Sequence, residues 1–215
     1  MAHRKLIVFV KAPRPGTVKT RLAEAIGSAD ACKAYRVLVE TLLEQLAELP
    51  EVELRFSPAD AAREIQPWLR AGWEARPQGT GDLGQRLVSA FAEAFSAGVK
   101  RVVIIGSDCP AVAVADIECA WSALLSHDVA LGPARDGGYW LIGLRQPQPE
   151  FFHSIPWSTA DVLRETQQRA RLLKLKTYLL RELTDVDTVN DWHEFMTVHI
   201  GRRGINGGGT RTILT

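Results

Sequence analysis

The sequence has few cysteines, no long apolar run and almost no net charge, and each shortage argues against a class of protein. Its three cysteines form no CxxC pair, and their odd number argues against a disulfide framework. No apolar stretch approaches bilayer length, and the first apolar run ends after five residues, so we expect neither a membrane span nor a signal peptide. A net charge of +1 provides no global field for nucleic acid or acidic membranes. We therefore expect a cytoplasmic protein.

What the sequence does have is the composition of one globular domain. It holds 215 residues, of which 46% are hydrophobic and 24% charged, enough to bury a real core. No composition shift, linker or internal repeat divides it. We expect a single domain over residues 1–200 and a flexible tail over residues 201–215, which contain five glycines.

Strand-like and helix-like segments alternate along the chain, as is typical of an α/β protein. The predicted strands are 5–10, 52–56, 73–76, 101–105, 129–131, 139–144 and 175–180, and the predicted helices are 29–49, 60–69, 83–97, 116–125, 161–172 and 189–199. Segments 129–131 and 139–144 are too close for a helical crossover, so they are antiparallel if they pair. We predict an α/β sandwich with a mixed, mainly parallel sheet.

The first predicted strand leads directly into a basic loop over residues 11–21. Its prolines stiffen the backbone, and Gly16 allows the backbone to approach a ligand. Four cationic side chains there can neutralise phosphate oxygens, namely Lys11, Arg14, Lys19 and Arg21. The alternative is a solvated loop after an ordinary strand. A P-loop is disfavoured because two residues separate Gly16 from Lys19.

A glycine-rich segment, residues 79–84, precedes the predicted helix 83–97 and fits the dinucleotide pattern G-x-G-x-x-G literally. That pattern belongs in the first strand–helix turn, and the strand before it here is weak, so a nicotinamide or flavin site is disfavoured. A helix N-terminus that offers amides to an anion is the better use. Gly81 and Asp82 are therefore candidates for nucleotide binding.

Three further loops carry acidic side chains. Asp108 follows the predicted strand 101–105, where a carboxylate can hold Mg²⁺ or Mn²⁺ together with substrate phosphates; the alternative is that it caps the following turn or helix. Asp136 lies in a tight turn that is either a plain hairpin or part of the same site. Asp185 and Asp187 alternate onto one face before the last helix, and either can help to hold the metal; the alternative is that Asp187 or Thr188 caps that helix.

Together these segments resemble a bacterial glycosyltransferase-A-like family within the nucleotide-diphospho-sugar transferase superfamily. The resemblance covers residues 5–195 and rests on KAPRPGTVKTRL from position 11, GDLG from 81, GSDCP from 106, GPARDGGY from 132, WST from 157 and DVDT from 185. The sequence is also similar to the molybdenum-cofactor and phospholactate guanylyltransferases. The resemblance implies a three-layer α/β/α fold, a nucleotide on the first loop, and Asp108 and Asp187 as ligands of Mg²⁺ or Mn²⁺.

The function that these observations favour is a metal-assisted glycosyltransferase acting on a nucleotide-diphospho-sugar. The basic loop would hold the phosphates, and Asp136 would orient the acceptor or accept its proton. Two alternatives remain, a nucleotidyltransferase that releases pyrophosphate from a nucleoside triphosphate and a non-catalytic nucleotide-binding module. We expect no nucleic-acid partner, and the sequence does not indicate the acceptor or the oligomeric state.

Overall fold

One seven-stranded sheet forms the centre of the computed structural model, which describes residues 3–206, with side chains up to residue 199. The strands are β1 (Arg4–Lys11), β2 (Val52–Ser57), β3 (Glu74–Pro77), β4 (Arg101–Ile105), β5 (Val129–Pro133), β6 (Tyr139–Leu144) and β7 (Thr177–Leu179). Their order is β3-β2-β1-β4-β6-β5-β7. Only β6 runs antiparallel to its neighbours, as the short spacing between β5 and β6 predicts.

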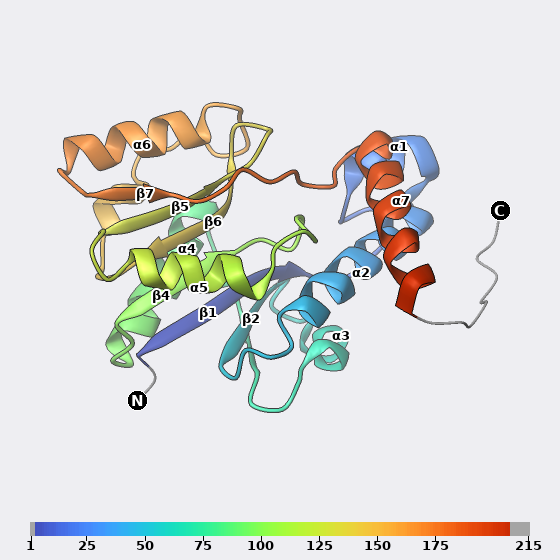
Figure 1. Ribbon diagram of the computed structural model, residues 1–215, viewed down its shortest axis with the longest axis horizontal. Coiled ribbons are helices and arrows are strands. Elements are labelled where there is room, and N and C mark those ends of the chain that lie inside the picture. Colours follow the sequence, from blue (N-terminus) through green and yellow to red (C-terminus); the bar gives the residue numbers. More distant parts are fainter. Residues whose placement is uncertain (1–2, 207–215) are drawn as a thin grey trace.

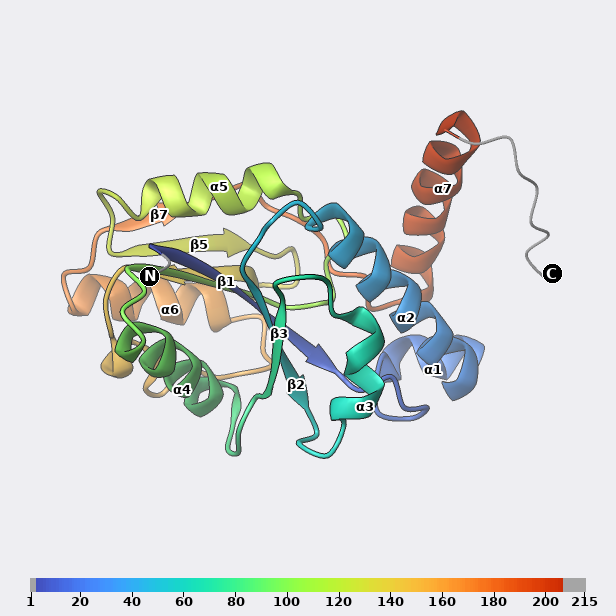
Figure 2. The same ribbon diagram turned by 90° about the horizontal axis from the view of Figure 1, so that it is seen from below.

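Helices cover both faces of this sheet, which gives the predicted three layers (Figure 1). They are α1 (Thr20–Ile26), α2 (Ser28–Gln45), α3 (Ala62–Ile65), α4 (Leu83–Ser96), α5 (Val114–Ala123), α6 (Val162–Leu172) and α7 (Val189–Asn206), with 3₁₀ turns η1 (Gln66–Trp68) and η2 (Pro149–Phe152). Figure 2 shows α5 on one side of the strands and α4 and α6 on the other. The fold class expected from the sequence is confirmed.

Strand β1 contributes apolar side chains to the cores on both faces of the sheet. Its side chains alternate between the two faces of the sheet, so that Leu6 and Val8 join the core under α2 and α5. Ile7 and Phe9 join the core under α4, α6 and η2. A strand buried on both faces reads as a continuous apolar run, and this is why residues 6–10 show no polar alternation.

A third, smaller cluster lies beyond the sheet and joins α1, α2 and α7. Leu22 of α1 and Ala31 of α2 are its buried centre, and Trp192 of α7 packs against them. Figures 1 and 2 both show α7 beside α1, away from the strands. Helix α7 runs to Asn206, past the boundary at residue 200 that the sequence suggested, and residues 207–215 of the expected tail lie outside the described residues. No helix within residues 3–206 has both the length and the apolarity to cross a bilayer.

Candidate functional site

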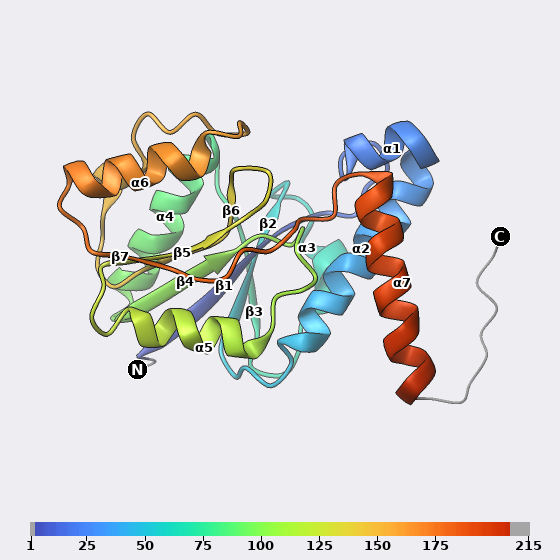
Figure 3. The same ribbon diagram turned by 45° about the horizontal axis from the view of Figure 1, so that its top comes forward.

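Four segments that the sequence singled out meet at one edge of the sheet. Strands β1, β4, β5 and β7 all point the same way, so the residues that follow them lie at a common carboxyl edge. The chain after β7 then crosses this edge toward α1 and α7 (Figure 3). On its way the Val186 amide donates to the Asp108 carbonyl at 2.9 Å. The loop after β4 and the segment before α7 are thereby held together.

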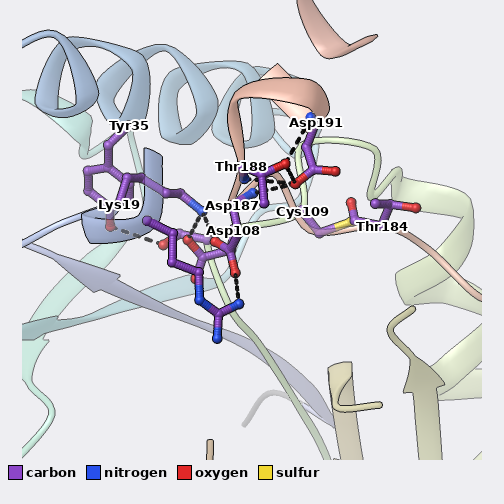
Figure 4. Close-up of polar contacts among 10 residues, drawn as sticks. Lys19, Tyr35, Asp108, Cys109, Thr184, Asp187, Thr188 and Asp191 are labelled. Carbon is purple, nitrogen blue, oxygen red and sulfur yellow. Dashed lines mark hydrogen bonds and ion pairs between the residues drawn. The ribbon is translucent and has the colours of Figure 1, made fainter. Parts of the chain in front are cut away.

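Lys19 connects the basic loop to the carboxylates at this edge (Figure 4). Its Nζ forms an ion pair with Asp108 Oδ1 and another with Asp187 Oδ1, the second at 2.9 Å. The Lys19 side chain is only 2% exposed, whereas those of Asp108 and Asp187 are 48% and 35% exposed. A buried ammonium thus bridges two carboxylates that remain open to solvent.

The backbone and the charges around Lys19 both hold its ammonium in this position. Lys19 adopts a left-handed conformation (φ 49°) immediately before α1, at the end of the loop that contains Gly16. Burial lowers the pKa of Lys19, but the carboxylates of Asp108 and Asp187 outweigh it, and the pKa is raised overall. Lys19 is therefore a permanent positive charge inside the site.

Asp185 adds a further carboxyl group to the cluster. Burial, reinforced by the neighbouring carboxylates of Asp108, Asp136 and Asp187, raises the pKa of Asp185 to about 7. Its Oδ1 is buried and has no hydrogen-bond partner among the described residues. Asp108, Asp136, Asp185 and Asp187 thus lie close together at this edge. Arg21 is the second cation beside Lys19, and its Nη1 lies 3.9 Å from Asp187 Oδ2.

The sequence left open whether Asp187 or Thr188 caps the last helix, and the structure separates the two roles. Asp191 Oδ2 accepts hydrogen bonds from the Thr188 amide at 2.8 Å and the Thr188 hydroxyl at 2.7 Å. The Asp191 amide in turn donates to Thr188 Oγ1 at 3.3 Å. Thr188 and Asp191 therefore cap α7 between them, and the carboxylate of Asp187 faces Lys19.

The sequence also left open whether Asp108 caps the next helix, and the structure assigns that cap to another residue. The amide of Ala113, just before α5, is capped by Asp116 Oδ2 at 2.8 Å. Asp116 also makes a two-pronged ion pair with Arg181. The capping role belongs to Asp116, and the Asp108 carboxylate lies at the sheet edge with Lys19.

A buried tyrosine of α2, which is not among the candidate site residues of the sequence, joins two parts of the site. The Tyr35 hydroxyl accepts a hydrogen bond from the Lys11 amide at 2.8 Å and lies 3.0 Å from Ser107 Oγ. Lys11 ends β1, and Ser107 precedes Asp108. Tyr35 thus ties the start of the basic loop to the loop that carries Asp108.

Replacing Tyr35 by phenylalanine should lower the free energy of unfolding by about 1–2 kcal/mol, because the Lys11 amide loses its partner. Urea denaturation measures the loss. Tyr178→Phe is the matched control, since its hydroxyl has only a distant contact with Cys119 Sγ at 3.8 Å, and we expect less than about 0.5 kcal/mol there. Equal losses in the two variants would contradict the assigned role.

Of the other cations of the basic loop, Arg14 is ion-paired with acidic side chains and Lys11, among the described residues, is not. Arg14 donates to both carboxylate oxygens of Glu64 and forms an ion pair with Asp60 at 3.2 Å. It fastens the loop to the segment around α3 and is already charge-paired. The Lys11 side chain is exposed and has no ion pair within residues 3–206. Of the four predicted phosphate-binding cations, the structure brings Lys19 and Arg21 to the carboxylates.

The predicted anion site at the start of α4 is partly used by the protein itself. Asp82 caps the helix by accepting from the Gln85 amide at 2.8 Å, and Gln85 Oε1 accepts from the Asp82 amide at 3.0 Å. Gly81 has φ +93°, and a Cβ there would lie 2.2 Å from Gln85 Oε1, so the capping box requires glycine. Gly81 and Asp82 shape this helix start, and their binding of a nucleotide stays a prediction.

Asp136 lies at the tip of the β5–β6 hairpin, at the same edge as Asp108. Its Oδ1 accepts the Gly138 amide at 2.9 Å, which fixes one carboxylate oxygen, and the residue is exposed. The hairpin is braced from two sides. Arg135 donates from its amide to the Leu183 carbonyl at 3.1 Å, and Leu163 donates from its amide to the Gly137 carbonyl at 2.8 Å. The turn thus connects β5 to β6 and also places Asp136 at the sheet edge where Asp108 lies.

The donor set at the edge suits a divalent cation only when a ligand completes it. Within the described residues no group of three or more His, Cys, Asp or Glu side chains is arranged to hold a metal ion. Asp108 and Asp187 present two partly exposed carboxylates, and Mg²⁺ is commonly bound by one or two carboxylates together with water and substrate phosphates. The two aspartates fit such a shared site.

A solved structure shares the whole architecture. It is a protein from Desulfovibrio desulfuricans, assigned provisionally as a nucleotide-diphospho-sugar transferase, with 36% sequence identity and a TM-score of 0.84. The similarity covers 93% of this chain and 88% of that one. No curated protein matches the chain at a significant level.

More distant structures share the fold alone. A CMP:2-keto-3-deoxy-manno-octonic acid synthetase in complex with CTP has 10% identity and a TM-score of 0.60 over 94% of this chain and all of that one. The 4-diphosphocytidyl-2C-methyl-D-erythritol synthase of Anaerococcus prevotii has 12% identity and a TM-score of 0.60 over 94% and 99% of the two chains.

A family model matches residues 42–159, more than half of the chain, and its description is an uncharacterized protein conserved in bacteria, DUF2064. The matched range includes the loops of Asp108 and Asp136. This match and the 36% identity to the Desulfovibrio protein together show the family of the chain. The chain belongs to the DUF2064 family of bacterial proteins, which here has the fold of the nucleotide-diphospho-sugar transferases.

Proposed function

We propose that the protein is a metal-assisted glycosyltransferase that uses a nucleotide-diphospho-sugar as donor. The observation that carries the proposal is the ion-pair cluster of Lys19 with Asp108 and Asp187, which joins a basic loop to two partly exposed carboxylates at the carboxyl edge of the sheet. Anionic phosphates and a divalent cation are the ligands that such a mixed cluster suits. The likeness to the provisionally assigned Desulfovibrio transferase supports it.

Basic residues of the chain bind the diphosphate of the donor, and acidic residues bind the metal ion. Lys19 and Arg21 bind oxygens of the diphosphate, and Lys11 adds charge at the exit of β1. Asp108 and Asp187 would hold Mg²⁺ or Mn²⁺, and such an ion would supply positive charge to stabilise the leaving nucleoside diphosphate. Tyr35 keeps the Lys11 and Asp108 loops at a constant separation.

Asp136 faces the acceptor side of this arrangement. One of its oxygens is engaged by the Gly138 amide, which leaves the other to accept the proton of an acceptor hydroxyl. Because the hairpin is braced by Leu183 and Leu163, the carboxylate is held in place before the acceptor arrives. Asp136 is therefore the proposed general base.

The cations of the basic loop do not by themselves distinguish a diphosphate from a triphosphate. Arg14 pairs with Glu64 and Asp60, away from Asp108 and Asp187, so Lys11, Lys19 and Arg21 are the cations proposed to bind phosphate oxygens. Nucleotidyl transfer is the second candidate, and its support is the fold shared with the CMP:2-keto-3-deoxy-manno-octonic acid synthetase solved with CTP and with the 4-diphosphocytidyl-2C-methyl-D-erythritol synthase. The two chemistries differ in the product they release.

The decisive measurement is ³¹P NMR of the products formed with Mg²⁺ from a panel of nucleotide-diphospho-sugars and nucleoside triphosphates, each with and without sugar and alcohol acceptors. We expect nucleoside diphosphate from a nucleotide-sugar, with slow hydrolysis where water replaces the acceptor. Pyrophosphate from a triphosphate would overturn glycosyl transfer in favour of nucleotidyl transfer. Binding of donors without any turnover would favour a non-catalytic nucleotide-binding module.

A further inference from the structure

The position of Lys19 has a consequence for the order in which ligands bind. We propose that Lys19 is a built-in counter-ion that occupies the cation position between Asp108 and Asp187, so that a divalent cation binds tightly only after an incoming phosphate has drawn the ammonium away. The destination of the ammonium rests on the proposed function. Its competition with a metal ion does not.

The first step is geometric. Lys19 Nζ contacts Oδ1 of both aspartates, the second at 2.9 Å. A Mg²⁺ ion bound by the same carboxylates would lie about 2.0–2.1 Å from their oxygens. The ammonium and the metal ion would then be neighbours inside a site where charge repulsion is only weakly screened. The two cations therefore exclude each other from the bridging position.

The second step concerns the surrounding charges. The carboxylates of Asp108 and Asp187 pair with the Lys19 ammonium, and Asp185 and Asp191 also interact electrostatically with it. Asp136 acts on this group through Asp185, and Arg21 is the second cation, paired with Asp187. Two neighbouring carboxylates are costly to hold together without a counter-ion, and Lys19 supplies that counter-ion in the absence of any ligand.

The third step is the route by which Lys19 leaves. Its side chain is 2% exposed, so solvent does not replace the two carboxylates as partners. A phosphate group at the same edge offers new anionic oxygens to the ammonium and to Arg21, and it frees the Oδ1 atoms of Asp108 and Asp187 for a metal. By linkage, an anion that tightens metal binding is itself bound more tightly when the metal is present.

The test is a titration of the protein with Mn²⁺ alone, in which electron paramagnetic resonance measures the free ion. Lys19→Gln should bind Mn²⁺ on the order of tenfold more tightly than the wild type, because the competing charge is gone. Lys33→Gln is the matched control, since Lys33 is exposed and pairs only with Asp30, and its Mn²⁺ affinity should equal that of the wild type. Equal affinities of wild type and Lys19→Gln would overturn the proposal.

A second measurement uses the wild type and does not depend on the folding of a variant. Sodium sulfate, a tetrahedral dianion, replaces sodium chloride at equal ionic strength, with a protein-free titration to correct for ion pairing. Sulfate should tighten Mn²⁺ binding by several-fold in the wild type, and an unchanged affinity would count against displacement of Lys19. No nucleotide or acceptor enters either experiment, so a failed product assay and a failed competition are separate results.

Discussion

Asp108→Asn is expected to lower the rate of donor turnover by about 10²-fold or more, the usual cost of losing a charged group at the reacting phosphates. The amide keeps the shape of the side chain but withdraws one of the two carboxylates of the proposed metal site. The fold should persist, because Asp108 is 48% exposed and Lys19 keeps its ion pair with Asp187. Steady-state kinetics with the donor identified by ³¹P NMR measure the change, and thermal melts verify folding.

The matched control is Asp30→Asn, which neutralises an exposed aspartate that pairs with Lys33 on α2. Its turnover should equal that of the wild type. A rate for Asp108→Asn within threefold of the wild type would remove Asp108 from the catalytic machinery. Addition of a chelator provides a companion test, because the activity of the wild type should fall and recover with Mn²⁺.

Gly137→Ala should cause the largest loss of stability, about 3 kcal/mol in the free energy of unfolding. Gly137 has φ +88°, and a Cβ there would lie 2.0 Å from the carbonyl oxygen of Ala160. Backbone strain of about 1–3 kcal/mol and overpacking of similar size act together. Urea denaturation measures the loss, and turnover should fall too, because the turn that carries Asp136 must shift.

Gly79→Ala separates strain from overpacking. Gly79 has φ +86°, close to that of Gly137, with no atom within 4 Å of the added Cβ, so only backbone strain applies and about 1–2 kcal/mol should be lost. If the two variants lose the same stability, the contact with Ala160 is not what restricts position 137.

The layers of the fold follow from local patterns that are visible in the sequence. The apolar runs and helical stripes predicted all seven strands and six of the seven helices within the described residues, with ends shifted by a few residues except in α7, which runs on to Asn206. The close spacing of β5 and β6 predicted their antiparallel pairing. Helix α1 was missed because it has seven residues and only Leu22 is buried, too short a segment for an apolar period to appear.

The partners of the site residues depend on contacts between distant parts of the chain. The sequence indicated that Asp108 and Asp187 belong to one site, but the burial of Lys19 between them could not be predicted, since it requires two loops far apart in sequence to close over it. Arg14 showed no sign of its partner Glu64 for the same reason. Tyr35 fits a helical apolar stripe as well as a leucine would, and nothing local distinguishes its hydroxyl.

The reversal of β6 separates two parts of the protein that can change independently. A parallel neighbour would need a long crossover between β5 and the next strand, whereas the antiparallel hairpin places only a short turn at the site edge. The exposed side chains of that turn, Arg135 and Asp136, can change without disturbing the order of the strands, because both ends of the turn are anchored in the sheet. If Asp136 contacts the acceptor as proposed, we expect substitutions at the hairpin tip to change acceptor preference while the basic loop and the aspartates that follow the other strands stay in place.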